Sequence, residues 1–262
     1  MRGIRRAMPK SIVRHLVRAS GTCAFLLGSG CHQRVASAPV QSDAATLFAA
    51  AMQQFRSGHF EKAQTQFQRL QFDLTPRDTL QAPVRFHLAE SYLGQGELIT
   101  AAREFRRAAD DYPASPLAPV ALLRLADAHS MLWRRSELDP TNGETALATL
   151  QELASRYPDS PAARIGAVRT RTLQEMFARK DYENGLFYFK RGGYDSAILY
   201  FRSLIVKYPG TAIVGDAYIK LVQAYRAINY REEREEVCAH LRQYFGGRTD
   251  VRRECGNGSP GR

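Results

Sequence analysis

The sequence predicts an all-α protein, a right-handed solenoid of about five stacked helix pairs, and three observations support this. Similar words recur along the chain: "DYPASPLAP" at 111–119, "RYPDSPAAR" at 156–164 and "KYPGTAIVG" at 207–215. An alanine stands eleven positions before each of their tyrosines, and a large apolar residue follows that alanine four positions later. The segments between the words are apolar at helical spacing, without the alternation of a strand.

Each repeated word combines a signal that ends one helix with a signal that begins the next. Proline lacks an amide hydrogen and clashes with the preceding turn, so Tyr157-Pro158 is expected to close a helix. Ser160-Pro161 is expected to cap the following helix and supply its first residue. The same device is predicted at Ser115-Pro116, and Thr211 supplies the cap alone. Joints this short connect antiparallel helices.

The repeat unit reads G-x-[LFY]-x-x-A-x-x-x-[FL]-x6-Y-P. Its small-residue position, called the anchor below, is followed four residues later by a large apolar residue on the same helical face. The anchors are Ala63, Ala101, Ala146, Ala197 and, in a degenerate last copy, Glu233. A tetratricopeptide repeat is a helix pair of about 34 residues, and we place the excess length in joints and extended helices. Residues 46–246 are therefore predicted to form tetratricopeptide-like helix pairs with a concave surface.

The N-terminus has the pattern of an export signal. Residues 1–30 hold six basic and no acidic residues and end in the apolar run "CAFLLGSG" before Cys31. This pattern predicts a signal peptide over 1–30, with translation starting at Met1 or Met8. Small residues before the cysteine favour lipoprotein processing, with a lipidated Cys31 and a flexible tether over 31–45. Ordinary cleavage nearby, or an uncleaved signal, is the alternative.

Charge and cysteine content narrow the possible functions. Six charges of the net +11 lie in residues 1–30, which leaves +5 on the other 232 residues and argues against nucleic-acid binding. The Gly- and Arg-rich tail, 247–262, is predicted to be disordered. In an oxidising compartment, Cys238 and Cys255 either form a disulfide or leave a semi-buried Cys238 and a free Cys255. The sequence does not choose between these.

No catalytic or cofactor motif is present. The chain lacks G-x-S-x-G, H-E-x-x-H, a P-loop and C-x-x-C, so neither an enzyme, a metal site nor a cofactor is expected. Trp133 is predicted to be a core residue. The polar insertion 134–145, with turn formers at Asn142-Gly143, is expected to be either a binding face or a passive loop. The aromatic residues of 181–194 serve either repeat packing or a groove for a peptide.

The signal, the cysteine, the tether and the five degenerate repeats together resemble the BamD family of outer-membrane assembly lipoproteins. The segments "DPTNGETALATLQELASRYPDSPAA" and "ARKDYENGLFYFKRGGYDSAILYFRSLIVKYPGTAIVGDAYIKLVQAYRAIN" carry the resemblance best. It implies a palmitate-bearing lipoprotein on the periplasmic face of the outer membrane. It further implies that C-terminal repeats bind the periplasmic domains of a barrel assembly subunit and that N-terminal repeats receive unfolded outer-membrane proteins.

Residue type and repeat position then select candidate binding residues. For the unfolded substrate these are Phe55, Phe60, Arg85 and Tyr92, and for the barrel subunit they are Tyr188, Tyr194, Tyr200 and Arg202. The alternative function is another envelope scaffold of the tetratricopeptide class, such as the Tol–Pal coordinator of cell division. That class often carries an N-terminal coiled coil, and residues 32–45 show no heptads.

Overall fold

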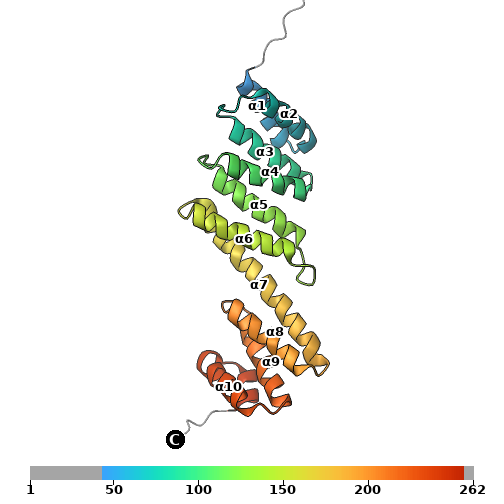
Figure 1. Ribbon diagram of the computed structural model, residues 1–262, viewed down its shortest axis with the longest axis vertical. Helices are drawn as coiled ribbons and strands as arrows, with labels where there is room; N and C mark the ends of the chain where they lie inside the picture. The colour runs from blue at the N-terminus through green and yellow to red at the C-terminus, as the bar shows by residue number, and fades with distance from the viewer. Residues whose placement is uncertain (1–42, 257–262) are drawn as a thin grey trace, which may run out of the picture. The chain divides into compact units, whose positions relative to one another are not determined.

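The computed structural model describes residues 43–256, and all regular secondary structure within this range is helical. Figure 1 shows the helices following one another along the chain as hairpins, which confirms the predicted α-solenoid of five helix pairs. The predicted signal peptide, Cys31 and nearly all of the tether lie outside the described residues. The helices are α1 (Ala44–Arg56), α2 (Phe60–Asp73), α3 (Gln81–Gly94), α4 (Leu98–Asp111), α5 (Ala118–Leu132), α6 (Thr141–Arg156), α7 (Pro161–Lys190), α8 (Tyr194–Lys207), α9 (Val214–Ala227), α10 (Arg231–Phe245) and α11 (Thr249–Cys255).

The anchors form the core of each hairpin, as the repeat unit predicts. Four second helices, α2, α4, α6 and α8, each bury their anchor alanine completely. The large apolar residues four positions later, Phe67, Phe105, Leu150 and Phe201, are at most 2% exposed. A small residue allows the helices to approach, and the large one fills the space beside it, stabilising each hairpin by about 1.5–3 kcal/mol per buried side chain. In α10 the anchor is the exposed Glu233, and only Cys238 and Leu241 are buried.

Four of the five hairpins share one turn. Its key residue has a positive φ: Gly58 (75°), Gly96 (80°), Gly192 (77°) and Asn229 (62°). In the second hairpin the Glu97 N–H donates to the Tyr92 carbonyl at 3.0 Å, which satisfies an end carbonyl of α3. Only glycine, or asparagine at modest cost, adopts this conformation readily, which explains the glycine five residues before Ala63, Ala101 and Ala197.

The α5–α6 hairpin replaces that turn with a longer loop. The prediction of a turn at Asn142-Gly143 is wrong, because both residues lie in the first turn of α6 and the loop spans 133–140, inside the third hairpin. Trp133 is 1% exposed, as predicted, and its ring lies against Gly143. The loop is held on α7, where Lys180 Nζ donates to the carbonyls of Ser136 (3.1 Å) and Leu138 (3.0 Å).

The joints between hairpins confirm the predicted helix ends. Tyr112, Tyr157 and Tyr208 are the C-terminal caps of α4, α6 and α8, with φ between −130° and −138°. Each of these tyrosines directly precedes a proline. A residue before proline avoids the helical conformation. The Tyr-Pro pair therefore ends α4, α6 and α8.

The predicted helix starts are only partly correct. Ser160 caps α7, since its Oγ accepts a hydrogen bond from the Ala163 N–H at 3.1 Å, and Pro161 is the first helical residue. Ser115 and Thr211 do not cap a helix, because α5 begins at Ala118 and α9 at Val214. Their hydroxyls form hydrogen bonds in the turn that precedes each helix instead. The Thr211 Oγ1–H donates to the Tyr208 carbonyl at 2.8 Å, and the Ser115 Oγ accepts from the Leu117 N–H at 3.2 Å.

Helix α7 is 30 residues long and joins two hydrophobic clusters. Its Leu173 and Phe177 belong to the cluster of α3–α7, whereas Ala178 belongs to the cluster of α7–α9. Phe177 and Tyr208 stack with ring centroids 6.1 Å apart and connect the two clusters. The third hairpin and the fourth therefore share one helix as a common support. No helix between residues 43 and 256 has the length and apolar character needed to cross a membrane.

The C-terminal segment differs from the prediction of a disordered tail. Residues Thr249–Cys255 form α11, which packs on α9 and α10. The Cys238–Cys255 disulfide, one of the two alternatives, is present. Val251 is 1% exposed, and Gln223 Nε2 donates to Glu254 Oε1 at 2.9 Å. Composition alone predicted disorder because it carries no information about this crosslink.

His87 on α3 is surrounded by aromatic rings of α1, α2 and α3. Its Nδ1 is buried and has no hydrogen-bond partner among the described residues. Burial lowers the pKa of His87; the charge of Glu90 raises it and that of Arg56 on α1 lowers it again. The folded state therefore favours the neutral imidazole. The rings around it are Phe48, Phe55, Phe67 and Phe86.

We expect Gly143→Ala to lower the free energy of unfolding by about 1–3 kcal/mol, because the added methyl group overlaps the Trp133 ring in a packed core. Urea unfolding followed by circular dichroism measures this. Gly210→Ala is the matched control, since a Cβ there meets no atom within 4 Å; its effect should stay within about 0.5 kcal/mol. Equal stability of the two variants would contradict the Trp133 contact.

We also expect acid to weaken the first hairpins through His87. Its folded pKa lies below the unfolded value of about 6.5, so its contribution is complete above that pH and is lost as the pH falls through the folded pKa. The measurement is the urea midpoint at pH 7.5 and 5.5, and His87→Leu should reduce the difference between them. His59→Gln, at an exposed histidine, should leave it unchanged. An unaltered difference in His87→Leu refutes the assignment.

Candidate protein-binding site

Two grooves have the same construction. Each lies between the second helices of two consecutive hairpins, and the first helix of the later hairpin forms its floor. The N-terminal groove lies between α4 and α6 over α5 and has a volume of about 490 Å³. The C-terminal groove lies between α8 and α10 over α9 and has a volume of about 380 Å³. Because Ala101 and Ala197 are equivalent anchors, positions in the two grooves can be paired along the sequence. The pairs are Leu125 with Leu221, His129 with Tyr225, and Arg106 with Arg202.

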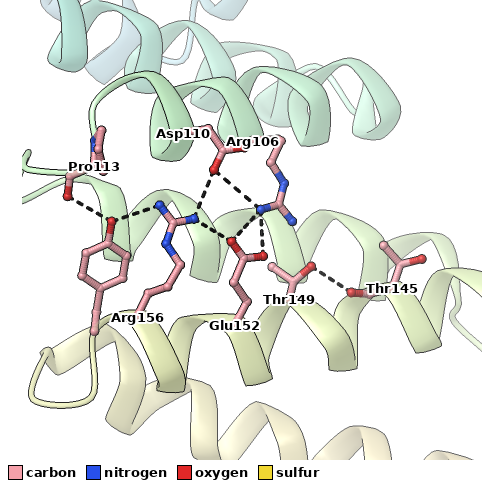
Figure 2. Close-up of polar contacts among 8 residues, drawn as sticks. Arg106, Asp110, Pro113, Thr145, Thr149, Glu152 and Arg156 are labelled. Atoms are coloured by element: carbon pink, nitrogen blue, oxygen red, sulfur yellow. Dashed lines mark hydrogen bonds and ion pairs between the residues drawn. The ribbon is translucent and has the colours of Figure 1, made fainter.

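Ion pairs bridge α4 and α6 beside the N-terminal groove. Figure 2 shows Arg106 and Asp110 of α4 pointing toward Glu152 and Arg156 of α6. Arg106 Nη1 donates to both Glu152 oxygens at 2.8 Å, and Arg156 Nη1 donates to Glu152 at 2.6 Å and to Asp110 at 3.1 Å. Burial raises the pKa of Glu152, but the hydrogen bonds from the two arginines outweigh it, so the net shift is downward. The arginine of this groove is therefore already paired.

The C-terminal groove lacks that network. The positions equivalent to Asp110 and Glu152 are Val206 and Ala239, which carry no charge. Arg202 is exposed, and no carboxylate of residues 43–256 lies within ion-pair distance of it. Loss of the two carboxylates therefore leaves the arginine of this groove without a carboxylate partner among residues 43–256.

The C-terminal groove combines apolar side chains with a basic residue on one wall and acidic residues on the other. Val206 on α8 is 78% exposed, whereas Glu233 and Glu236 line the α10 wall. Tyr218 and Tyr225 of α9 form the floor, and burial raises the pKa of both. A protein segment with an apolar residue flanked by charges of both signs fits this arrangement.

The residues predicted to contact the barrel subunit divide into two groups. Tyr188 and Tyr200 stack with ring centroids 5.6 Å apart, and Tyr194 meets Phe189 edge-on at 5.4 Å. These three tyrosines are half-buried and hold the α7–α8 hairpin together. Arg202 lies in the C-terminal groove. The structure therefore brings the tyrosines together as packing residues and places the arginine at a separate surface.

The residues predicted to contact unfolded substrate do not all meet. Phe55 and Phe60 contact each other with ring centroids 5.6 Å apart, and the Tyr92 hydroxyl accepts from Gln68 at 2.7 Å. Phe60 also lies over Gly94 on α3, close to Tyr92 in sequence. Arg85 instead pairs with the buried Glu104 at 3.4 Å and with Asp111 at 3.7 Å. Arg85 thus has a structural role in the second hairpin.

Sequence reasoning missed most of the C-terminal groove. It treated Glu233 as a degenerate anchor and did not select Glu236, Val206, Tyr218 or Tyr225. The signal that identifies them is the pairing of Arg106 with Arg202 through the anchors, which becomes informative once the ion pairs of Arg106 are known. Among residues 43–256 there is no cluster of three His, Cys, Asp or Glu side chains that could hold a metal ion.

Comparisons with known proteins agree with the repeat architecture. Residues 40–241 match the family YfiO, described as "Outer membrane lipoprotein". The outer membrane protein assembly factor BamD of Caulobacter vibrioides is 29% identical over 136 residues, which cover 52% of this chain and 45% of that protein. The chain therefore spans under half the length of that relative.

Solved tetratricopeptide structures are also similar. The TPR2AB domain of yeast Sti1 in complex with pHSP90 gives a TM-score of 0.43 at 12% identity and covers 81% of each chain. The TPR domain of P58(IPK) gives a TM-score of 0.43 at 14% identity, covering 81% of this chain and 54% of that one.

Proposed function

Because the chain belongs to the YfiO family of outer membrane lipoproteins, we propose that it is a non-enzymatic scaffold subunit of the β-barrel assembly machinery. It is held by a lipid at the periplasmic face of the outer membrane. The observation that carries this proposal is the extent of the family match, since residues 40–241 include α1 to α9 and most of α10. The name of the Caulobacter relative, an outer membrane protein assembly factor, supports the same role.

The scaffold acts by binding at two separate places. The C-terminal groove receives the periplasmic domains of the barrel assembly subunit. A carboxylate of that partner pairs with Arg202, in the place that Glu152 occupies beside Arg106. An apolar partner side chain covers Val206, and a basic one meets Glu233 and Glu236. Arg202 thereby gains a carboxylate partner and the exposed Val206 becomes buried, and both changes favour association.

The first hairpins receive segments of unfolded outer-membrane proteins. Phe55 and Phe60 contact each other there, and Tyr92 packs against the same hydrophobic cluster as Phe55. Both phenylalanines are half-buried, so part of each ring remains available to an apolar segment. The exposed Phe72 on α2, 93% accessible, adds apolar surface to the same hairpin. Aromatic surfaces of this kind bind extended apolar peptides without a need for one sequence.

Lipid attachment at Cys31 is the basis of the proposed location. We expect labelled palmitate to be incorporated into the wild-type chain and the label to be lost completely in Cys31→Ser. Cys255→Ser, which removes a cysteine far from the N-terminus, controls for labelling at other thiols and should keep the signal. A fully labelled Cys31→Ser chain would show that the anchor is elsewhere or absent.

Partner capture tests the function itself. A chain tagged after Arg262 is recovered from detergent-solubilised envelopes and its partners are identified by mass spectrometry. We expect an outer-membrane barrel protein with periplasmic domains, and we expect Arg202→Glu to reduce its recovery about tenfold or more, since opposing like charges at a buried pair costs more than about 1.4 kcal/mol.

Arg171→Glu is the matched control, because it reverses an exposed arginine of α7 outside both grooves, and it should leave recovery unchanged. Equal losses in both variants would refute the placement of the partner at Arg202. Recovery of Tol–Pal or peptidoglycan-synthesis components in place of the barrel protein would refute the proposed function and retain only the scaffold.

A further inference from the structure

Helix α11 occupies the place that the first helix of a sixth hairpin would take. In the third hairpin, Leu123 and Asp127 of α5 face α7, and Asp127 pairs with Arg169 at 3.1 Å. The equivalent residues of α9 are Ile219 and Gln223, which face α11 instead. α11 therefore covers the surface of α9 on which the repeat array would otherwise continue, as terminal caps do in repeat proteins.

This cap has little packing of its own. α11 is seven residues long, well below the length at which a helix is stable alone, and Val251 is its one completely buried apolar residue. Two exposed ion pairs join this segment to α9: Arg248 with Asp216 at 2.5 Å and Arg226 with Glu254 at 3.0 Å. Arg248 and Arg226 are more than a third exposed, so these two pairs contribute little. Two hydrogen bonds add to them, from Gln223 Nε2 to Glu254 at 2.9 Å and from Arg242 Nη1 to the Cys255 carbonyl at 3.1 Å. The disulfide is the one covalent crosslink that holds α11 on α10.

The same disulfide supports α10, which forms one wall of the C-terminal groove. α10 lacks the buried alanine of the other second helices and has only Cys238 and Leu241 buried. Cys238 is adjacent to Val237 and two residues from His240, and both of these line the groove. Fastening Cys238 therefore fixes the wall that the partner would contact.

We propose that the Cys238–Cys255 bond is a redox latch that sets the shape of the C-terminal groove. With the bond formed, α10 and α11 are locked on α9, and the groove can receive its partner. Its reduction by a dithiol frees α11 and loosens α10. The effect on partner binding rests on the proposed function, whereas the latch itself does not.

The chemistry of opening follows from the unequal burial of the two sulfurs. Cys238 is 1% exposed and Cys255 is partly exposed, so a dithiol attacks Cys255 Sγ. The S–S bond breaks, a mixed disulfide forms at Cys255, and Cys238 leaves as a thiolate that takes up a proton. The second thiol of the reductant then displaces Cys255. The protein has gained two electrons and two protons, and the dithiol has become a disulfide.

Hydrogen exchange of the full chain tests the latch without any partner. We compare the oxidised wild type, the wild type in dithiothreitol and Cys255→Ala. Amide exchange in α11 and α10 should rise at least tenfold on reduction, and Cys255→Ala should exchange as fast whether or not dithiothreitol is present. Peptides of α4 and α5, remote from the bond, should be unaffected. Unchanged protection of α10 and α11 after complete reduction would overturn the latch.

Partner capture then tests its consequence. Recovery of the barrel protein by Cys255→Ala should fall, as we also expect for Arg202→Glu. Faster exchange with unchanged recovery would overturn the link between latch and groove. If the oxidised wild type also recovers no barrel protein, the proposed function fails, while the exchange result still decides the latch.

Discussion

The close approach of two helices at a buried alanine is the constraint on which the rest of this structure depends. Four anchor alanines are completely buried, and in a close-packed interior a larger side chain would have to displace its neighbours: Ala63, Ala101, Ala146 and Ala197. The aromatic residue or leucine four positions later can then fill the remaining space. The first four hairpins repeat this contact, so residues at the same distance from their anchor reach equivalent places. A difference between two such residues therefore becomes a difference between two surfaces.

Charge distinguishes the two halves of the solenoid. In the first half, Arg124 joins Glu90 to Asp127, and Asp127 also pairs with Arg169, so the pairs connect α3, α5 and α7 along the first helices. A second set joins α4 to α6 along the second helices. The equivalent positions of α8 and α10 hold Val206 and Ala239, which leaves Arg202 without a carboxylate among the described residues. The arginines of the first set and of the second set are thus paired with carboxylates, whereas Arg202 is not.

The last hairpin shows how a degenerate repeat is stabilised by other means. With Glu233 at the anchor, α10 cannot approach α9 through an alanine. Only two residues of α10, Cys238 and Leu241, are buried. The crosslink to Cys255 and the short α11 cover Ile219 and Val222 of α9. Cys238 in this contact and Val237 in the C-terminal groove are neighbours on α10, which links the position of α11 to the shape of the groove.

The sequence by itself determined the five hairpins, the anchors, the helix ends at Tyr112, Tyr157 and Tyr208, and the resemblance that led to the family. These features depend on interactions within a few residues or on periodicity, both of which are visible along the chain. Only the tertiary structure decided the role of Arg85, the loop 133–140, α11 and the difference between Arg106 and Arg202. Each of these depends on a partner distant in sequence: Glu104 for Arg85, Lys180 for the loop, Cys238 for α11 and Glu152 for Arg106. Local propensity carries no information about such contacts, because packing between helices brings the partners together.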